Sequence, residues 1–283
     1  MKKNIILSMV FGMVAMASFT SCNDFLQVSA TNQKEMDKPF TTYDELRLAT
    51  AYLYMKPWLG FHSTRLFAMG DARGNNIYGD NNNETGYAPY CLFTDKPNTP
   101  GLADAWNSLY IVVTQADYII NDYAPQGRMH FEERLADSCE GEARFMRAAA
   151  YYYLASYWHD VPVMENPVEH TNAFNLAPTR FEDVIRYGIR DLEYAAEYLP
   201  LSDADGRVTR YSALGLLARY YVTLAAYARG GHCTQSTLDY YEASDAHDLA
   251  EILYGLAKTA AGEVIAGQGR YGLMEDYEEI FRV

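Results

Sequence analysis

The segment from residue 60 to residue 101 interleaves aromatic rings with amide, carboxylate and guanidinium side chains. A sugar ring has an apolar face and a rim of hydroxyl groups, so a site that binds it needs flat rings beside hydrogen-bonding groups. The competing interpretation is that these rings pack the segment onto the rest of the protein. The candidate ligand-binding residues in this segment, or just before it, are Trp58, Asp71, Arg73, Asn75, Asn76, Tyr78, Asn81, Tyr87 and Tyr90.

The backbone of the same segment is expected to form a long loop. Glycine permits positive φ angles and asparagine forms local turns, and loops of this length in a compact domain are often functional. The residues that favour irregular backbone here are Gly70, Gly74, Gly79, Gly86, Pro89, Pro97, Pro100 and the asparagines at 75–76 and 81–83.

The stretch Asp80–Glu84 is rich enough in oxygen atoms to suggest a Ca²⁺ site. It lacks the alternating ligands, spread over about 12 residues, that an EF-hand loop requires. We therefore expect a solvated turn here and no metal site. The six histidines are scattered and have no zinc-motif spacing.

Motifs of common enzyme classes are missing from the sequence, which has no G-x-S-x-G, no P-loop and no dinucleotide-binding glycine turn. We interpret Glu142, Arg144 and Arg147 as structural ion-pairing residues, with Glu140 one helical turn before Arg144. A glycoside hydrolase would use two carboxylates, and with 37 acidic residues composition alone does not test that alternative. No catalytic residue and no cofactor is predicted.

The N-terminus has the features of a bacterial lipoprotein signal. Two lysines precede an apolar stretch over 5–19, which is shorter than the ~20 residues of a spanning helix. Small residues then lead to Cys22, as in a lipobox. We predict a signal peptide over 1–21, acyl chains on Cys22, and a lipid anchor and tether over 22–40. An uncleaved membrane anchor and an ordinary secretory signal are the alternatives.

From residue 41 to residue 283 the sequence predicts an all-α domain. A first helix begins at Thr42, and no stretch alternates as a strand would. Apolar residues recur with helical periodicity over 102–123, 131–158, 179–198, 209–228 and 245–266.

Two helix starts carry a further signal. Thr42–Glu45 and Thr179–Glu182 both fit the capping box, in which a Thr hydroxyl and a Glu carboxylate satisfy amides of the first turn. Trp106 lies inside a helical pattern and is expected in the core. Trp158 ends a helix and is expected to pack rather than to bind.

The sequence repeats itself at an offset of 70 residues, about twice the 34-residue tetratricopeptide period. Small residues beside aromatic ones let two helices approach closely while rings fill the gaps. We infer an irregular α-solenoid of tetratricopeptide-like helix pairs with long ligand-face loops, and the alternative is coincidence in a protein rich in Ala and Tyr. The aligned pairs are Ala143 and Ala213, Ala148 and Ala218, Tyr151 and Tyr221, Leu154 and Leu224, Ala155 and Ala225, and Tyr157 and Tyr227.

The net charge and the cysteine spacing argue against several classes of function. The 283-residue chain has a formal net charge of −14, which argues against nucleic acid as a partner and against electrostatic docking on anionic lipid. Cys91, Cys139 and Cys233 show no metal-binding spacing, and we expect them to be small buried residues. One disulfide among them is the open alternative in an exported protein.

The stretch GEARFMRAAAYYYLASYWHDVPV over 141–163 contains a Gly-Glu-Ala-Arg motif on a predicted helix and an Asp-Val-Pro segment after it. Further distinctive stretches are Cys22–Leu26, Gly70-Asp71, WNSLYIVVTQADYIIN over 106–121, Asp191–Glu193 with Leu199-Pro200, Gly206–Thr209 with 213–220, and Tyr271–Leu273 with Tyr277 and Phe281. Together these stretches resemble the SusD/RagB family of outer-membrane lipoproteins, and the stretch over 141–163 is the strongest match.

This resemblance implies a non-enzymatic protein that is lipid-anchored in the outer membrane and exposed on the cell surface. Such a protein captures an oligosaccharide or polysaccharide and passes it to a SusC-like TonB-dependent transporter. A peptide-binding member of the family and a protein-binding helical scaffold are the alternatives. Family chains are considerably longer, so we expect the domain over 41–283 to be truncated at its C-terminal end.

Overall fold

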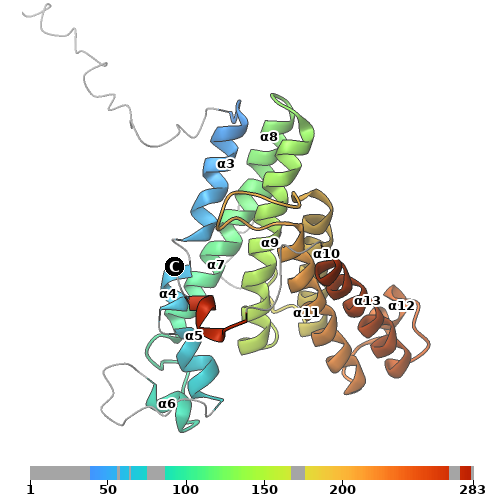
Figure 1. Ribbon diagram of the computed structural model, residues 1–283. Coiled ribbons are helices and arrows are strands. Elements are labelled where there is room, and N and C mark those ends of the chain that lie inside the picture. The colour runs from blue at the N-terminus through green and yellow to red at the C-terminus, as the bar shows by residue number, and fades with distance from the viewer. Residues whose placement is uncertain are drawn as a thin grey trace, which may run out of the picture. The chain divides into compact units, whose positions relative to one another are not determined.

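The computed structural model describes residues 39–55, 58–63, 65–74, 87–166, 176–267 and 275–281. The chain from Pro39 to Val283 forms one compact unit (Figure 1). The predicted signal peptide and Cys22 lie outside the described residues. So do the candidates Asn75, Asn76, Tyr78 and Asn81 and the stretch Asp80–Glu84.

The described chain is helical, which confirms the predicted fold class. Within these residues the one strand-like pairing is an isolated antiparallel bridge between Val161 and Thr179. The elements are α3 (Tyr43–Ala51), η1 (Tyr52–Tyr54), α4 (Leu59–His62), α5 (Arg65–Phe67), η3 (Ala68–Ala72), α6 (Ala88–Cys91), α7 (Leu102–Tyr118), η4 (Ile119–Tyr123), α8 (Ala124–Arg128), α9 (Glu133–Trp158), α10 (Phe181–Tyr198), α11 (Arg210–Arg229), α12 (Gln235–Tyr240), α13 (Ala246–Ala266) and η5 (Tyr277–Phe281).

The long helices pack in chain order. Helix α7 packs on α9, α9 on α10, α10 on α11, and α11 on α13 (Figure 1). Each helix therefore buries one face on its predecessor and another on its successor, as stacked helix pairs do. Among the described helices, none combines the length and the apolar character needed to cross a bilayer.

Helices α9 and α11 are the two copies of the sequence repeat. Tyr151 and Tyr221 are both buried, as are Leu154 and Leu224. Tyr157 and Tyr227 are both half-buried. The pair formed by Ala148 and Ala218 differs, because only Ala148 is fully buried. The matching burial shows that the aligned residues occupy equivalent positions in two helices of the stack.

One of the two predicted capping boxes is confirmed. At α3 the Glu45 amide donates to Thr42 Oγ1 at 3.3 Å, and the Thr42 amide donates to Glu45 Oε2 at 3.3 Å. The prediction at Thr179–Glu182 is wrong, since Arg180 is the N-cap of α10 and has no side-chain cap. Thr179 lies in the bridge with Val161 instead.

The hydrogen bonds of Glu182 explain why the capping box predicted at Thr179–Glu182 does not form. Its Oε2 accepts hydrogen bonds from the Thr234 amide at 2.9 Å and from Thr237 Oγ1 at 2.8 Å, so the carboxylate holds the start of α12. Burial alone would raise the pKa of Glu182, but these hydrogen bonds hold it below its usual value. A distant partner therefore competed successfully with the local cap.

The expected long loop over 60–101 is wrong in part. Helices α5 and α6 and the π-helical turn η3 occupy much of its described length. Ala68, Met69 and Ala72 are buried, so a helical turn there places three apolar side chains in the core. Gly101, at a φ of 88°, ends the irregular part and starts α7.

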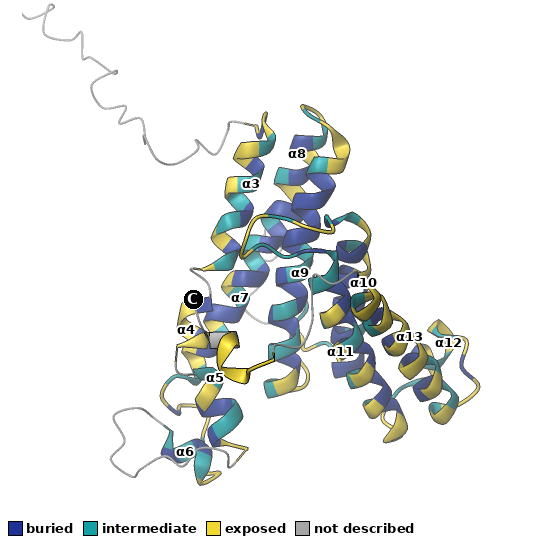
Figure 2. Ribbon diagram, in the orientation of Figure 1, coloured by how far each residue is buried: buried dark blue, intermediate teal, exposed yellow. Residues whose placement is uncertain are grey.

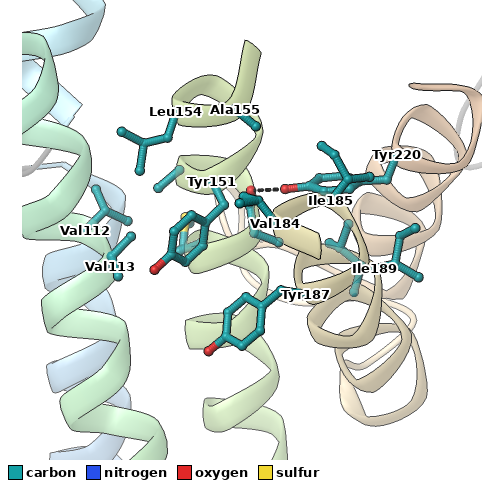
Figure 3. Close-up of a cluster of buried hydrophobic side chains, with 14 of the residues drawn as sticks. Val112, Val113, Tyr151, Leu154, Ala155, Val184, Ile185, Tyr187, Ile189 and Tyr220 are labelled. Carbon is teal, nitrogen blue, oxygen red and sulfur yellow. Dashed lines mark hydrogen bonds between the residues drawn. The ribbon is translucent and has the colours of Figure 1, made fainter. Parts of the chain in front are cut away.

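Helix α9 is buried along most of its length (Figure 2). Residues of α7, α10 and α11 cluster with those of α9 (Figure 3). Figure 3 shows this cluster, in which Tyr151, Leu154 and Tyr220 are fully buried. The Tyr220 hydroxyl donates a hydrogen bond of 2.6 Å to the Ala148 carbonyl. The aromatic core therefore also joins α11 to α9 through a satisfied polar atom.

The close approach of α10 and α11 yields a prediction. A Cβ at Gly188 would lie 2.5 Å from the ring of Tyr220, which is fully buried and cannot move aside. Gly188→Ala should therefore lower the free energy of unfolding by about 1–3 kcal/mol, the cost of overpacking a core. Thermal or urea unfolding followed by circular dichroism measures this change.

The matched control is Gly215→Ala in α11, where nothing lies within 4 Å of the added carbon. That variant should gain about 0.5–1 kcal/mol through helix propensity. Equal stability of Gly188→Ala and the wild type would contradict the packing described here.

Candidate functional site

Two of the predicted aromatic candidates lie in the core. Trp58 is 8% exposed, and its indole N–H donates to the Leu53 carbonyl at 2.8 Å. Its ring packs against Tyr153 with the centroids 6.4 Å apart. Tyr90 is 1% exposed. Neither ring presents a face that a sugar could cover, so the structure gives both a packing position.

The exposed candidate Arg73 stands at the centre of a different cluster. Its Nη1 donates to Asp95 Oδ1 at 2.7 Å, and its guanidinium lies 5.0 Å from the centroid of the Phe93 ring. Phe93 is 65% exposed and has a φ of 55°, in the left-handed region that non-glycine residues rarely adopt. A charged pair and an exposed ring are thus held together at the surface.

The candidates Asp71 and Tyr87 belong to the two short elements next to this cluster in the chain. Asp71 lies on η3, which packs against α6, and Tyr87 is the half-buried residue from which α6 begins. A Cβ at the neighbouring Gly70 would lie 3.1 Å from the Tyr157 hydroxyl. The turn that carries Asp71 therefore lies close to the C-terminal end of α9.

We call the surface formed by Arg73, Phe93 and Asp95 the Arg73 patch. Arg73 was a candidate in the sequence, whereas Phe93 and Asp95 were not among the candidates. The available signal was an aromatic residue and an acid shortly before Pro97, a residue that disfavours helical backbone at the position before it. The patch combines a ring with hydrogen-bonding groups, the requirement for binding a sugar.

The charged residues of α9 form structural ion pairs, which confirms their interpretation. Glu142 is fully buried and accepts from Arg47 at 2.8 Å, from Arg207 at 2.6 Å and from the Tyr54 hydroxyl at 3.0 Å. The predicted pair between Arg144 and Glu140 is present at 2.7 Å. The contacts of Glu142 join separate segments of the chain, as structural ion pairs do.

Arg147 makes the most deeply buried of these contacts. Its Nε donates to Asp191 Oδ2 at 2.8 Å and its Nη2 to Asp191 Oδ1 at 2.7 Å, while Nη1 bonds Asp117. The side chain is 4% exposed. One guanidinium therefore links α7, α9 and α10.

Metal binding and thiol chemistry find no support in the part of the chain that the structure describes. No group of three or more His, Cys, Asp or Glu in it is placed to hold a metal ion. Its three cysteines form no disulfide, and only Cys139 is fully buried, so the expectation of buried cysteines holds in part. Burial raises the pKa of Cys139 and of Cys233 to about 12, which keeps both thiols protonated.

Comparison with known families identifies the chain. Residues 24–222 match the SusD-like family described as "Starch-binding associating with outer membrane". The chain belongs to the SusD-like family. That description names a binding activity, in agreement with the lack of catalytic motifs in the sequence.

Individual SusD-like proteins support this family assignment. A SusD-like protein of Bacteroides ovatus is 30% identical over 93% of this chain and 45% of its own length. A crystal structure with xylogluco-oligosaccharide has a TM-score of 0.67 and 28% identity, over 84% of this chain and 43% of that one. A laminarin-binding SusD-like protein has the same fold, with a TM-score of 0.65 and 18% identity over 84% of this chain and 48% of that one. The chain thus spans less than half the length of these relatives.

Asp117 gives a prediction about pH. Burial raises the pKa of Asp117 to about 7 despite its contact with Arg147, whereas a carboxyl in the unfolded chain ionises near ~3.9. Between these values the folded protein keeps a proton that the unfolded chain has lost, so this group makes stability fall as pH rises from about 4 to about 7. Asp117→Asn should remove that contribution, and its stability relative to wild type should increase with pH over this range.

The measurement is the melting temperature of both proteins at a series of pH values. His62, whose pKa burial lowers, contributes the opposite slope, but it is present in both proteins and cancels in the difference. Parallel curves for the two proteins between pH 4 and 7 would rule out a buried proton on Asp117.

Proposed function

We propose that this SusD-like chain is a non-catalytic, surface-exposed lipoprotein of the outer membrane. It captures an oligosaccharide or polysaccharide for uptake through a SusC-like TonB-dependent transporter. The observation that carries the binding role is the Arg73 patch, where an exposed ring lies beside a charged pair. The starch-binding description of the family and the relative crystallised with xylogluco-oligosaccharide make a glucan the first ligand class to test.

Within the chain we assign ligand contact to the Arg73 patch. Asp71 and Tyr87 stay candidates, and so do Asn75, Asn76, Tyr78 and Asn81, because they lie close to the patch residue Arg73 in the sequence or in the segment that follows it. Trp58 and Tyr90 are assigned to packing, since their burial leaves no ring face for a ligand.

Arg73→Ala and Phe93→Ala test the binding role. Each should weaken the binding of a malto-, xylogluco- or laminari-oligosaccharide by about 10- to 100-fold, because a charged hydrogen bond or a buried ring face contributes about 1.5–3 kcal/mol. Isothermal titration calorimetry with the three oligosaccharides measures the affinities. Reducing-sugar release in the same mixtures tests for hydrolysis.

Arg134→Ala is the matched control. Arg134 also lies over an aromatic ring, that of Tyr198 at 5.2 Å, but it belongs to the first turn of α9, far along the helix from the patch. The control should bind as the wild type does. Unchanged affinity in both patch variants would remove the patch from the site, and sugar release would show an enzyme.

The lipid anchor is tested at Cys22. Cys22→Ser should abolish incorporation of labelled palmitate and release the protein from the membrane fraction, since the acyl chains supply the attachment. Cys91→Ser, which alters a thiol of the helical domain, should remain acylated. Labelling of the Cys22→Ser variant would contradict the anchor.

A further inference from the structure

A hollow of about 540 Å³ opens beside the Arg73 patch, between the first turns of α7 and the last turn of α9. We call it the Trp notch. This volume lies within the ~300–1,000 Å³ typical of sites for small molecules. Its principal lining residues are Asp95, Lys96, Pro97, Trp106, Asn107 and Trp158.

The two indoles form a corner. The rings of Trp106 and Trp158 are nearly perpendicular, at 83°, with their centroids 5.2 Å apart. Both side chains are half-buried, and both line the hollow. Trp106 was expected in the core and Trp158 was expected to pack, and both are half-buried against the core. Both rings also line the hollow, which the sequence did not indicate.

Neighbouring rings hold this corner in place. Tyr110 lies 4.8 Å from Trp106, and its hydroxyl is fixed by a hydrogen bond of 2.7 Å to the Pro162 carbonyl. Tyr157 lies 6.1 Å from Trp158 on the other side. A ligand that stacks here therefore loses little affinity to the ordering of side chains.

Polar groups line the rim. Asp95, Lys96 and Asn107 supply an acceptor, a donor and an amide that offers both. Thr99 fixes the turn that carries Lys96, since its Oγ1 accepts from the Lys96 amide at 2.7 Å and its amide donates to the Lys96 carbonyl at 2.8 Å. The apolar floor and polar rim match the face and edge of a pyranose ring.

Asp95 connects the notch to the Arg73 patch, because the carboxylate that lines the notch is also bonded to Arg73. We infer that the Trp notch is a second sugar subsite, in which a pyranose unit of the same bound oligosaccharide stacks on the Trp106–Trp158 corner. This inference rests on the proposed glycan-binding function and adds to it a position that binds one further unit.

The test uses tryptophan emission together with affinity. The probes are maltohexaose, laminarihexaose and a xylogluco-oligosaccharide, titrated into the full chain. Stacking should shift the emission of the half-buried indoles and protect them from acrylamide quenching. Trp158→Ala should weaken hexasaccharide binding by about tenfold, as loss of an aromatic anchor does, and Trp158→Phe should lie between this variant and the wild type.

Tyr254→Ala, at an exposed tyrosine on α13, is the control for affinity and should bind as the wild type does. Circular dichroism melting establishes that each variant folds, and Asn107→Ala at the rim tests the notch without removing a ring. If Arg73→Ala weakens binding while Trp158→Ala and Asn107→Ala do not, the notch is not a subsite and the proposed function stands. If no probe binds the wild type, both are overturned.

Discussion

Charge buried along helix α9 is the constraint on which the rest of the structure depends. Glu142 and Arg147 lie in the interior, where a charge without a partner costs several kcal/mol, about 3–5 in measured cases. Each must therefore meet opposite charge from another segment. Glu142 binds arginines from α3 and from the segment before α11, and Arg147 binds aspartates from α7 and α10. The pairing sets the register of these elements on α9.

The register of α7 on α9 also determines which residues of the two helices meet at the surface. Trp106 precedes Asp117 by eleven residues on α7, and Trp158 follows Arg147 by eleven on α9. At ~1.5 Å per residue, both indoles lie about 16 Å along their helices from the shared ion pair. The helices are successive and packed on each other, so equal offsets in opposite chain directions bring the two rings together. The buried pair thus positions the Trp notch without touching it.

Features that depend on local sequence could be predicted, and features that depend on a distant partner could not. The repeat, the cap at Thr42 and the pair between Glu140 and Arg144 each involve residues a few positions apart or a periodic pattern, and all three are present. The cap predicted with Glu182 failed because Thr234 and Thr237, over fifty residues later, bind that carboxylate. Nothing near Glu182 in the sequence records that competition.

At the candidate site, too, local sequence did not predict which side chains are exposed. Tyr90 and Phe93 are three residues apart, and in a continuing helix both rings would lie on one face. Helix α6 ends at Cys91, and Phe93 takes a left-handed backbone angle, so Tyr90 is buried while Phe93 is exposed beneath Arg73. Composition identified a stretch with the right chemistry. The residue at which the four-residue helix α6 ends decides which of these two rings is exposed.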